Sequence, residues 1–337
     1  MPTGSDELAA QLVRLCRERT GDPLAAVSEV GALPGHAGFS FGFTLASGGR
    51  SERLVLRLPP PGVKHEGTAD VVRQARLMET LGAQGIPVPP VRWYGSETDW
   101  FGRPYSVVAL RPGRTFSFEH PMELPLGPES AAGLAEQAIA VLATLHGLDW
   151  GRVAPWLGSP LPPAEDVERW DGFRERSADP QLVALGPELR RRLLERAPRE
   201  ARVGIFHGDF QWSNLLIDAG ALAAVLDWEL AGVGAVRNDL GWLQVFSDGE
   251  SWAEEGPSMP PGLDPGELEV LYHEATGDRD GDAGWFRALA GYKFAVISGF
   301  NLMLHRRGKR HDPFWEQLAT SIPVLMERAL EILEATR

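Results

Sequence analysis

The spacing of apolar residues predicts one helix at the start of the chain and a strand-rich region after it. Leucines recur at intervals of four and three over residues 6–19, which is the pattern of an amphipathic helix. Further along, alternating large and small residues, with a turn at 47–49, are typical of strands. These patterns predict strands over 39–45, 54–58, 88–94 and 105–110, and a second helix over 68–81. The first third should therefore form a small antiparallel sheet with one inserted helix.

The pattern changes near residues 109–113, and helical periodicity dominates from there on. Helices are predicted over 131–146, 187–196, 264–275, 282–305 and 312–336, and short apolar segments over 203–206, 214–217 and 223–226. Asp-Pro pairs at 264–265 and 312–313 are good helix starts, and Pro323 should interrupt the last helix. We expect an α+β chain with two lobes, a small sheet-rich lobe over 1–110 and a larger, mainly helical lobe over 111–337.

Composition narrows the possible partners. The chain has 337 residues and a formal net charge of −13, which argues against a nucleic acid as the main partner. Its one cysteine, Cys16, excludes an intrachain disulfide and fits a reducing compartment. No apolar run reaches the roughly 18 residues of a membrane span, and the first residues do not resemble a signal peptide. We therefore expect a cytoplasmic protein with no membrane partner, and the oligomeric state stays open.

One segment carries the strongest chemical signal. His207 and Asp209 form an H-x-D element, and Asn214 follows the aspartate by five residues. Asp227 lies thirteen residues after Asn214, with two short apolar strands and a turn at 218–220 between them. A hairpin of that length should return Asp227 close to Asn214. Four residues in this register are unlikely in an ordinary polar turn.

Phosphoryl transfer requires this set of side chains. One carboxylate must accept the proton of the attacking hydroxyl, and oxygen ligands must hold Mg²⁺ against the phosphates. We expect Asp209 to be the base and Asn214 and Asp227 to hold the metal. His207 is interpreted as structural, holding the loop by hydrogen bonds.

These two segments resemble the signature elements of the aminoglycoside phosphotransferase family, which shares the protein-kinase-like fold. Within that family the chain is most similar to small-molecule kinases related to the kinase portion of some acyl-CoA dehydrogenase fusions. The resemblance implies a bilobal fold with a nucleotide-binding first lobe and a catalytic, substrate-binding second lobe. It implies ATP or GTP and Mg²⁺ as cofactors. The phosphate acceptor is a small-molecule hydroxyl, as in aminoglycosides, macrolides, choline-like alcohols or hydroxyacyl compounds.

The resemblance also assigns nucleotide-binding roles in the first lobe. Gly35, Gly38 and Ser40 lie where the phosphate-covering loop belongs. Arg57 takes the place of the strand cation that contacts phosphate, and arginine offers a bidentate grip. Gln74 stands where the next helix usually presents a glutamate, and we expect it to orient Arg57 by a hydrogen bond.

Other positions follow with less direct roles. Backbone groups of Ala109 and Arg111 match the segment that meets adenine. Asp239 resembles the family's structural acid. Three residues flanking the catalytic positions are candidates for substrate contact: Trp212, Trp228 and Glu229.

Two alternatives remain. The first is a nucleotide-binding pseudokinase without turnover, which Gln74 favours and the intact Asp209, Asn214 and Asp227 oppose. The second is a metal-dependent hydrolase, which lacks the further histidine and carboxylate ligands that such sites need. His146 is interpreted as a core or capping histidine. The sequence does not identify the phosphate acceptor.

Overall fold

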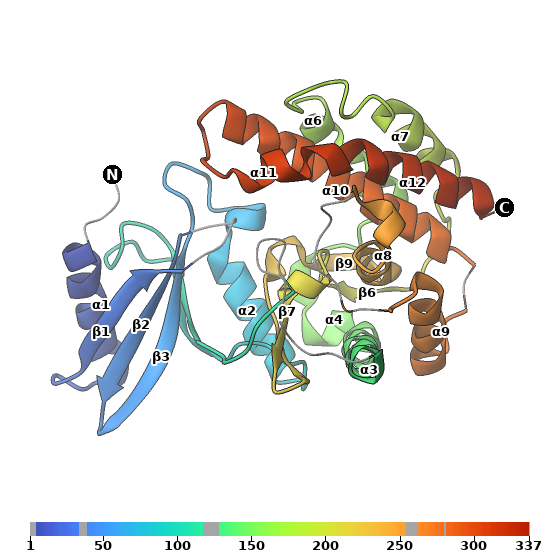
Figure 1. The fold of residues 1–337 in the computed structure, drawn as a ribbon. Coiled ribbons are helices and arrows are strands. Elements are labelled where there is room, and N and C mark those ends of the chain that lie inside the picture. Colours follow the sequence, from blue (N-terminus) through green and yellow to red (C-terminus); the bar gives the residue numbers. More distant parts are fainter. Residues whose placement is uncertain are drawn as a thin grey trace. The chain divides into compact units, whose positions relative to one another are not determined.

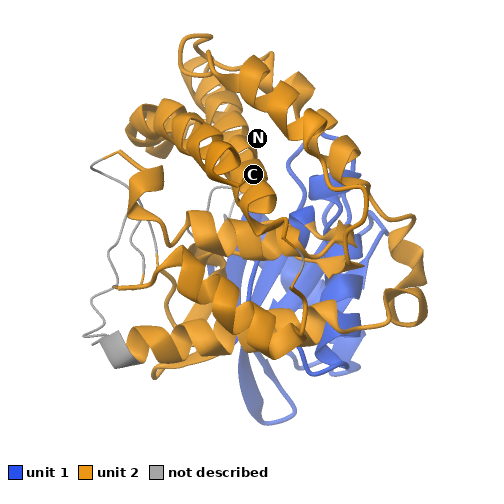
Figure 2. Cartoon of the chain, turned by 90° about the vertical axis from the view of Figure 1, so that its right-hand side faces the viewer, with its two compact units in different colours: residues 1–112, 223–230 blue, residues 113–222, 231–337 orange. Residues whose placement is uncertain are grey.

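The computed structural model describes residues 5–33, 39–116, 128–253, 260, 262–279 and 281–336. The chain divides into two compact units, which Figure 2 colours separately. The first unit comprises residues 1–112 and 223–230, and the second comprises 113–222 and 231–337. The expected lobe boundary at residue 110 takes no account of the segment 223–230. That segment belongs with the first unit, where the Val225 N–H donates to the Pro87 carbonyl at 2.7 Å.

The first unit is built on a five-stranded antiparallel sheet in the order β1-β2-β3-β5-β4. Figure 1 labels its first three strands, which lie beside helix α1. Its strands are β1 (Ala26–Ala32), β2 (Phe39–Ser47), β3 (Arg50–Leu58), β4 (Val91–Gly95) and β5 (Tyr105–Ala109). Helix α1 (Ser5–Thr20) precedes the sheet, and η1 (Gly67–Ala69) and α2 (Val71–Gly82) lie between β3 and β4. The predicted antiparallel sheet with one inserted helix is confirmed.

Alternation along β3 assigns its side chains to two faces. Leu54, Leu56 and Leu58 are buried in one core with the leucines of α1. Because successive side chains point to opposite faces of a strand, Arg57 projects from the other face. The pattern that predicts the strand thereby also places a cation on the face away from α1.

The apolar pattern does not reveal strand β1. The reason is a bulge: the register with β2 shifts between Ser28 and Gly31, and Glu29 has a positive φ of 52°. An extra residue breaks the period of two on which strand prediction relies. Only Val27 and Val30 of this strand pack against the core.

The second unit is mainly helical. Its longer helices are α3 (Pro128–His146), α7 (Gly186–Glu195), α8 (Arg237–Val245), α9 (Pro265–Thr276), α10 (Ala283–Arg306) and α12 (Ser321–Ala335). Short helices are α4 (Trp150–Val153), α5 (Pro163–Glu168), α6 (Asp171–Arg174) and α11 (Phe314–Gln317), with 3-10 turns η2 (Pro155–Leu157), η3 (Trp212–Asn214), η5 (Gly249–Ser251) and η6 (Leu318–Thr320). The five helices predicted in this region are therefore confirmed, except that the last is broken.

Two small sheets complete the chain. β6 (Val203–Phe206) pairs antiparallel with β9 (Gly232–Ala235), and β7 (Leu215–Asp218) pairs with β8 (Ala221–Val225), within which the boundary between the units falls. The 3-10 turn η4 (Trp228–Leu230) follows β8. Gly234 is required in β9, because a Cβ there would lie 2.9 Å from the Leu161 carbonyl oxygen and 3.0 Å from the Phe206 ring.

Pro323 explains why the last helix is broken. Proline lacks an N–H, and its ring clashes with the carbonyl four residues earlier, so it is tolerated only in the first turn of a helix. The chain accordingly forms α11 and η6 and starts α12 at Ser321, two residues before Pro323. The expected cap at Asp312 is wrong: α11 begins at Phe314, and the Asp312 carboxylate accepts from the Trp315 indole at 2.9 Å.

The expected cap of α9 is confirmed and is testable. Asp264 accepts from the backbone N–H of Gly266 and Glu267, with Pro265 at the first helical position. We expect Asp264→Ala to lower the free energy of unfolding by about 1 kcal/mol, because two N–H groups lose their acceptor. Urea unfolding measures this, and Asp264→Asn should retain most of the stability. Equal losses in both variants would contradict the capping role.

Candidate active site

The loop after β6 brings two predicted catalytic residues together. Gly208 has a φ of 88°, a left-handed conformation that glycine adopts without steric cost, and the chain turns sharply there. Asn214 then donates from Nδ2 to the carbonyl oxygen of Asp209 at 2.9 Å and to its carboxylate Oδ2 at 2.8 Å. The ring of His207 accepts from the Asp209 N–H at 3.2 Å, which agrees with its structural interpretation.

The carboxylate of Asp239 holds this loop through two hydrogen bonds to its backbone. Its Oδ2 accepts from the N–H of His207 at 2.7 Å, and its Oδ1 accepts from the N–H of Gly208 at 2.8 Å. The carboxylate is fully buried, so two charge-assisted hydrogen bonds fix the backbone just before Asp209. Asp239 lies in the first turn of α8, and a rigid helix thereby supports the loop.

A second layer supports Asp239. Nε2 of His146 lies 3.1 Å from Asp239 Oδ2, and Nδ1 of His146 lies 2.9 Å from the Tyr272 hydroxyl. Because a carboxylate only accepts, Nε2–H donates and Nδ1 accepts from Tyr272. Burial raises the pKa of Tyr272, which keeps its hydroxyl protonated for this role. His146 is thus a core histidine, as expected, and Tyr272 is a residue that the sequence analysis missed.

In the first unit, Arg57 contacts two acidic residues. Its Nη2 lies 2.9 Å from Asp227 Oδ1 and 3.3 Å from Glu229 Oε2. Burial alone would lower the pKa of Arg57, but the two carboxylates outweigh it and raise the pKa, so the guanidinium stays charged. Asp227 has a φ of 59°, and such left-handed residues cluster where function constrains the backbone.

The sheet register places two hydroxyl side chains beside Arg57. Ser40 of β2 and Ser106 of β5 are its direct partners on the two neighbouring strands. Directly opposed residues point to the same face of a sheet, so Ser40 and Arg57 share a face. The other two predicted loop residues, Gly35 and Gly38, lie outside the described residues.

Gln74 does not make the expected hydrogen bond to Arg57. The side chain is buried on α2, and its Nε2 donates to the Thr68 carbonyl at 2.8 Å. Arg57 is instead held by carboxylates that follow β8, which provide the negative charge that an amide cannot. The expectation was wrong because the family resemblance indicated a partner for Arg57 on α2, whereas the folded chain places Asp227 and Glu229 against it.

The predicted adenine-contact segment ends the sheet. The Ala109 N–H donates to the Pro90 carbonyl at 2.8 Å, so a base could meet only the carbonyl of this residue. Arg111 lies just beyond β5 and is exposed. The roles of both residues stay predictions.

The two tryptophans that were candidates for substrate contact are core residues. Trp212 and Trp228 are each 1% exposed. Their indole N–H groups donate to Ser247 Oγ at 2.8 Å and to the Val225 carbonyl at 3.0 Å. Side chains buried in this way support the backbone next to Asn214 and Asp227, which are predicted to hold the metal. Glu229 contacts Arg57, as described above.

A buried ion pair beside Asp239 also escaped sequence analysis. Lys293 of α10 donates to Asp166 Oδ2 at 2.6 Å and to Asn238 Oδ1 at 2.8 Å. Burial lowers the pKa of Lys293 to about 8, while Asp166 opposes the shift. The sequence offered one signal for this pair: Lys293 lies in an otherwise apolar helical stretch, and a charge buried there needs a partner of opposite charge. This pair fixes the residue adjacent to Asp239 in α8.

Asn214 and Asp227 each carry a side-chain oxygen of the kind that a hard cation prefers, one in each unit. Asn214 uses its amide nitrogen on Asp209, which leaves its carbonyl oxygen as a possible ligand, and Asp227 offers carboxylate oxygen. In the described part of the chain, no three His, Cys, Asp or Glu side chains cluster as a metal site.

Comparison with known proteins decides the family. The model of the phosphotransferase enzyme family matches residues 33–261, which include both signature segments. The chain belongs to this family. The expected resemblance and the enzyme class, a small-molecule kinase, are confirmed.

Relatives of this phosphotransferase are distant in sequence. It is 25% identical over 310 residues to acyl-CoA dehydrogenase family member 11 of Pongo abelii, covering 85% of this chain and 38% of that protein. It thus spans well under two thirds of the length of such relatives.

Solved structures share its fold. A Ralstonia eutropha JMP134 protein described as a candidate aminoglycoside phosphotransferase superposes with a TM-score of 0.77 at 20% identity, covering 97% of this chain and 98% of that one. A thermostable mutant of APH(4)-Ia in complex with ADP and hygromycin B gives 0.59 at 15% identity, covering 96% and 98%. The expected kinase-like α+β fold is confirmed. None of the helices in the described residues is long and apolar enough to cross a membrane.

Proposed function

We propose that this phosphotransferase moves the γ-phosphoryl group of ATP or GTP to a hydroxyl of a small molecule, with Asp209 as the base. The observation that carries the proposal is the fixed loop at 207–209. Asp239 anchors its backbone through two N–H groups, and Asn214 orients the Asp209 carboxylate. A carboxylate held in this way can accept the hydroxyl proton as the oxygen attacks phosphorus and ADP leaves.

Asn214 and Asp227 would hold Mg²⁺, which neutralises phosphate charge when bound. Arg57 would add a second positive charge, and its contacts with Asp227 and Glu229 keep it oriented before nucleotide arrives. Ser40, opposite Arg57, and the backbone of Ala109 and Arg111 would contribute to nucleotide binding. Gln74 would contribute indirectly, by holding the segment before α2 through its hydrogen bond to the Thr68 carbonyl.

The acceptor is proposed only by class. The Ralstonia protein and the APH(4)-Ia complex suggest polyhydroxylated antibiotics, whereas the acyl-CoA dehydrogenase relatives suggest a hydroxyacyl or other metabolic alcohol. The acceptors that these names suggest differ in chemical class, but all of them are small molecules. An alcohol panel that includes both classes separates an antibiotic-modifying role from a metabolic one.

ADP release tests the proposal directly. Purified protein with Mg²⁺ and ATP should release ADP slowly, and an acceptor from the panel should stimulate release. Mass spectrometry should find the acceptor heavier by one phosphoryl group. A chain that binds nucleotide but never releases ADP, with any acceptor, would instead be the pseudokinase.

We expect Arg57→Gln to weaken MgATP binding by roughly tenfold or more, because a charge-assisted contact with phosphate is lost. Calorimetry on the purified variant measures the dissociation constant. Arg53→Gln is the matched control, since Arg53 lies four residues earlier on β3 and is exposed. Equal affinities for both variants and the unaltered protein would refute a phosphate-binding role for Arg57.

A further inference from the structure

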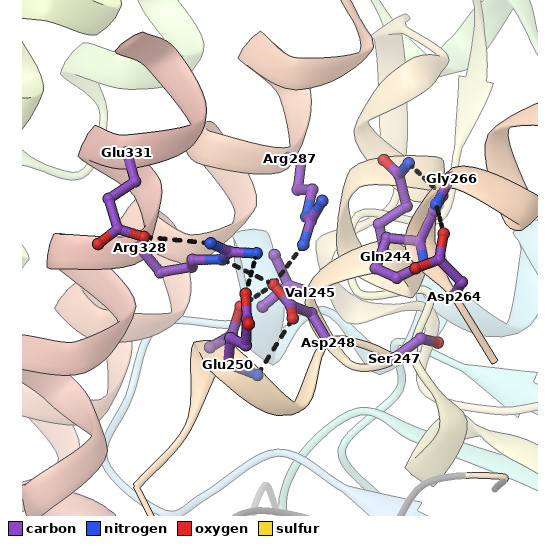
Figure 3. Close-up of polar contacts among 12 residues, drawn as sticks. Gln244, Val245, Ser247, Asp248, Glu250, Asp264, Gly266, Arg287, Arg328 and Glu331 are labelled. Atoms are coloured by element: carbon purple, nitrogen blue, oxygen red, sulfur yellow. Dashed lines mark hydrogen bonds and ion pairs between the residues drawn. The ribbon is translucent and has the colours of Figure 1, made fainter. Parts of the chain in front are cut away.

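The second unit contains a cavity that includes none of the residues proposed for phosphotransfer. Its volume is about 430 Å³, and α8, α9, α10 and α12 contribute its walls. That volume lies within the roughly 300–1,000 Å³ of small-molecule sites. The polar side chains that line it include Gln244, Glu269, Arg287, Arg328 and Glu331. Figure 3 shows most of this group.

Gln244 carries an unused hydrogen-bond acceptor at this cavity. The residue is 2% exposed, and its Nε2 donates to the Pro265 carbonyl at 2.8 Å. Its Oε1 is buried and has no hydrogen-bond partner among the described residues. Buried polar atoms in folded proteins are nearly always paired, so this oxygen indicates a missing donor.

Arg287 carries an unused donor on another wall. Its Nη2 pairs with Asp248, whereas its Nε is buried and has no partner in the described part of the chain. Two residues that line the cavity, Gln244 of α8 and Arg287 of α10, thus each keep a buried polar atom without a partner among the described residues. A group that both donates and accepts would satisfy the two atoms, and a hydroxyl does both.

The charges around the cavity disfavour an anion. Arg328 is held by three carboxylates, at 3.1 Å to Asp248, 2.5 Å to Glu250 and 3.1 Å to Glu331 (Figure 3). Of these three carboxylates Glu331 lines the cavity, and Glu269 adds a second carboxylate to the lining and a fourth acidic residue to the group. Four acidic residues thus face two arginines, both of which are already paired.

We propose that this cavity binds a small, uncharged polyhydroxylated molecule, whose hydroxyls donate to Gln244 and the lining glutamates and accept from Arg287 Nε. The walls also connect to the catalytic loop. α8 carries Asp239, and α9 carries Tyr272, which contacts His146. A molecule bound in the cavity would thereby restrict the motion of α8 and α9, and so of Asp239 and Tyr272, which hold the 207–209 loop.

Titration of the full chain tests this site. Myo-inositol and glucose are the neutral probes, and glucose 6-phosphate is the anionic one. Calorimetry gives affinity, and the ¹⁵N signals of arginine Nε–H groups report contact at Arg287. We expect millimolar binding of the neutral probes and at least tenfold weaker binding of glucose 6-phosphate. Binding needs no nucleotide and should persist in Asp209→Asn, so this result is independent of phosphotransfer.

Two variants locate the site. Gln244→Leu removes the acceptor, and Ala335→Leu fills the cavity from α12 without altering its polar atoms. Each substitution should weaken the binding of the neutral probes at least tenfold. Glu327 is exposed on the same helix, α12, and Glu327→Leu should leave this binding unchanged. No neutral binding, binding unchanged in both cavity variants, or tighter binding of the phosphate ester would each overturn the proposal.

Discussion

Asp209→Asn is expected to fold normally, to bind nucleotide with unaltered affinity and to lose roughly a hundred- to ten-thousand-fold in turnover. The substitution keeps the shape of the side chain, so the amide can still occupy the position beside Asn214. It cannot accept the proton of an attacking hydroxyl at neutral pH. ADP release at saturating ATP measures the loss, and equilibrium titration measures the affinity.

The control for this prediction lies on the same stretch of chain. Asp218 ends β7 and is exposed, so Asp218→Asn should keep full turnover. If Asp209→Asn turned over at the rate of Asp218→Asn, the assignment of Asp209 as base would be wrong. A drop in both variants would point to instability of the region instead of lost chemistry.

Asp239→Asn should damage both stability and turnover. The carboxylate accepts from two backbone N–H groups and from His146. An amide offers one acceptor oxygen, and its NH₂ group would face a backbone N–H or the histidine proton. We expect the free energy of unfolding to fall by about 3 kcal/mol, since each hydrogen bond to a charged group contributes roughly 1.5–3 kcal/mol. Urea unfolding at fixed pH measures the change.

Turnover separates loop positioning from general stability. The folded fraction of Asp239→Asn should turn over at least tenfold more slowly, because the backbone before Asp209 is no longer fixed. Asp312→Asn is the matched buried control: it accepts from the Trp315 indole, away from the loop. It should cost stability and leave turnover per folded molecule intact. The positioning role fails if both variants turn over equally fast.

Most elements of the fold could be predicted because their periodicity is local. The leucines of α1 and the alternation along β3 depend only on which face each element buries. β1 could not be predicted, because its bulge breaks that period. The helix expected over 312–336 is broken because proline is tolerated only in the first turn of a helix. Helix α12 therefore begins at Ser321, just before Pro323.

The site was predictable where residues sit close in sequence. The spacing of Asp209 and Asn214 led directly to a contact that the structure contains. The partner of Arg57 was not predictable in this way, because Asp227 lies 170 residues away and the choice between it and Gln74 depends on the folded chain. Tyr272 and Lys293 escaped for the same reason, as their partners lie far away in sequence.

Because residues 223–230 belong to the first unit, the chain passes between the units three times instead of once. A fragment ending at Pro112 would therefore retain the five strands but leave Arg57 without either carboxylate. Separate expression of the first unit would require grafting the Asp227 segment back onto residues 1–112. A single proteolytic cut near Pro112 would leave residues 1–112 as a separate chain, attached to residues 223–230 only by non-covalent contacts such as the Arg57–Asp227 ion pair.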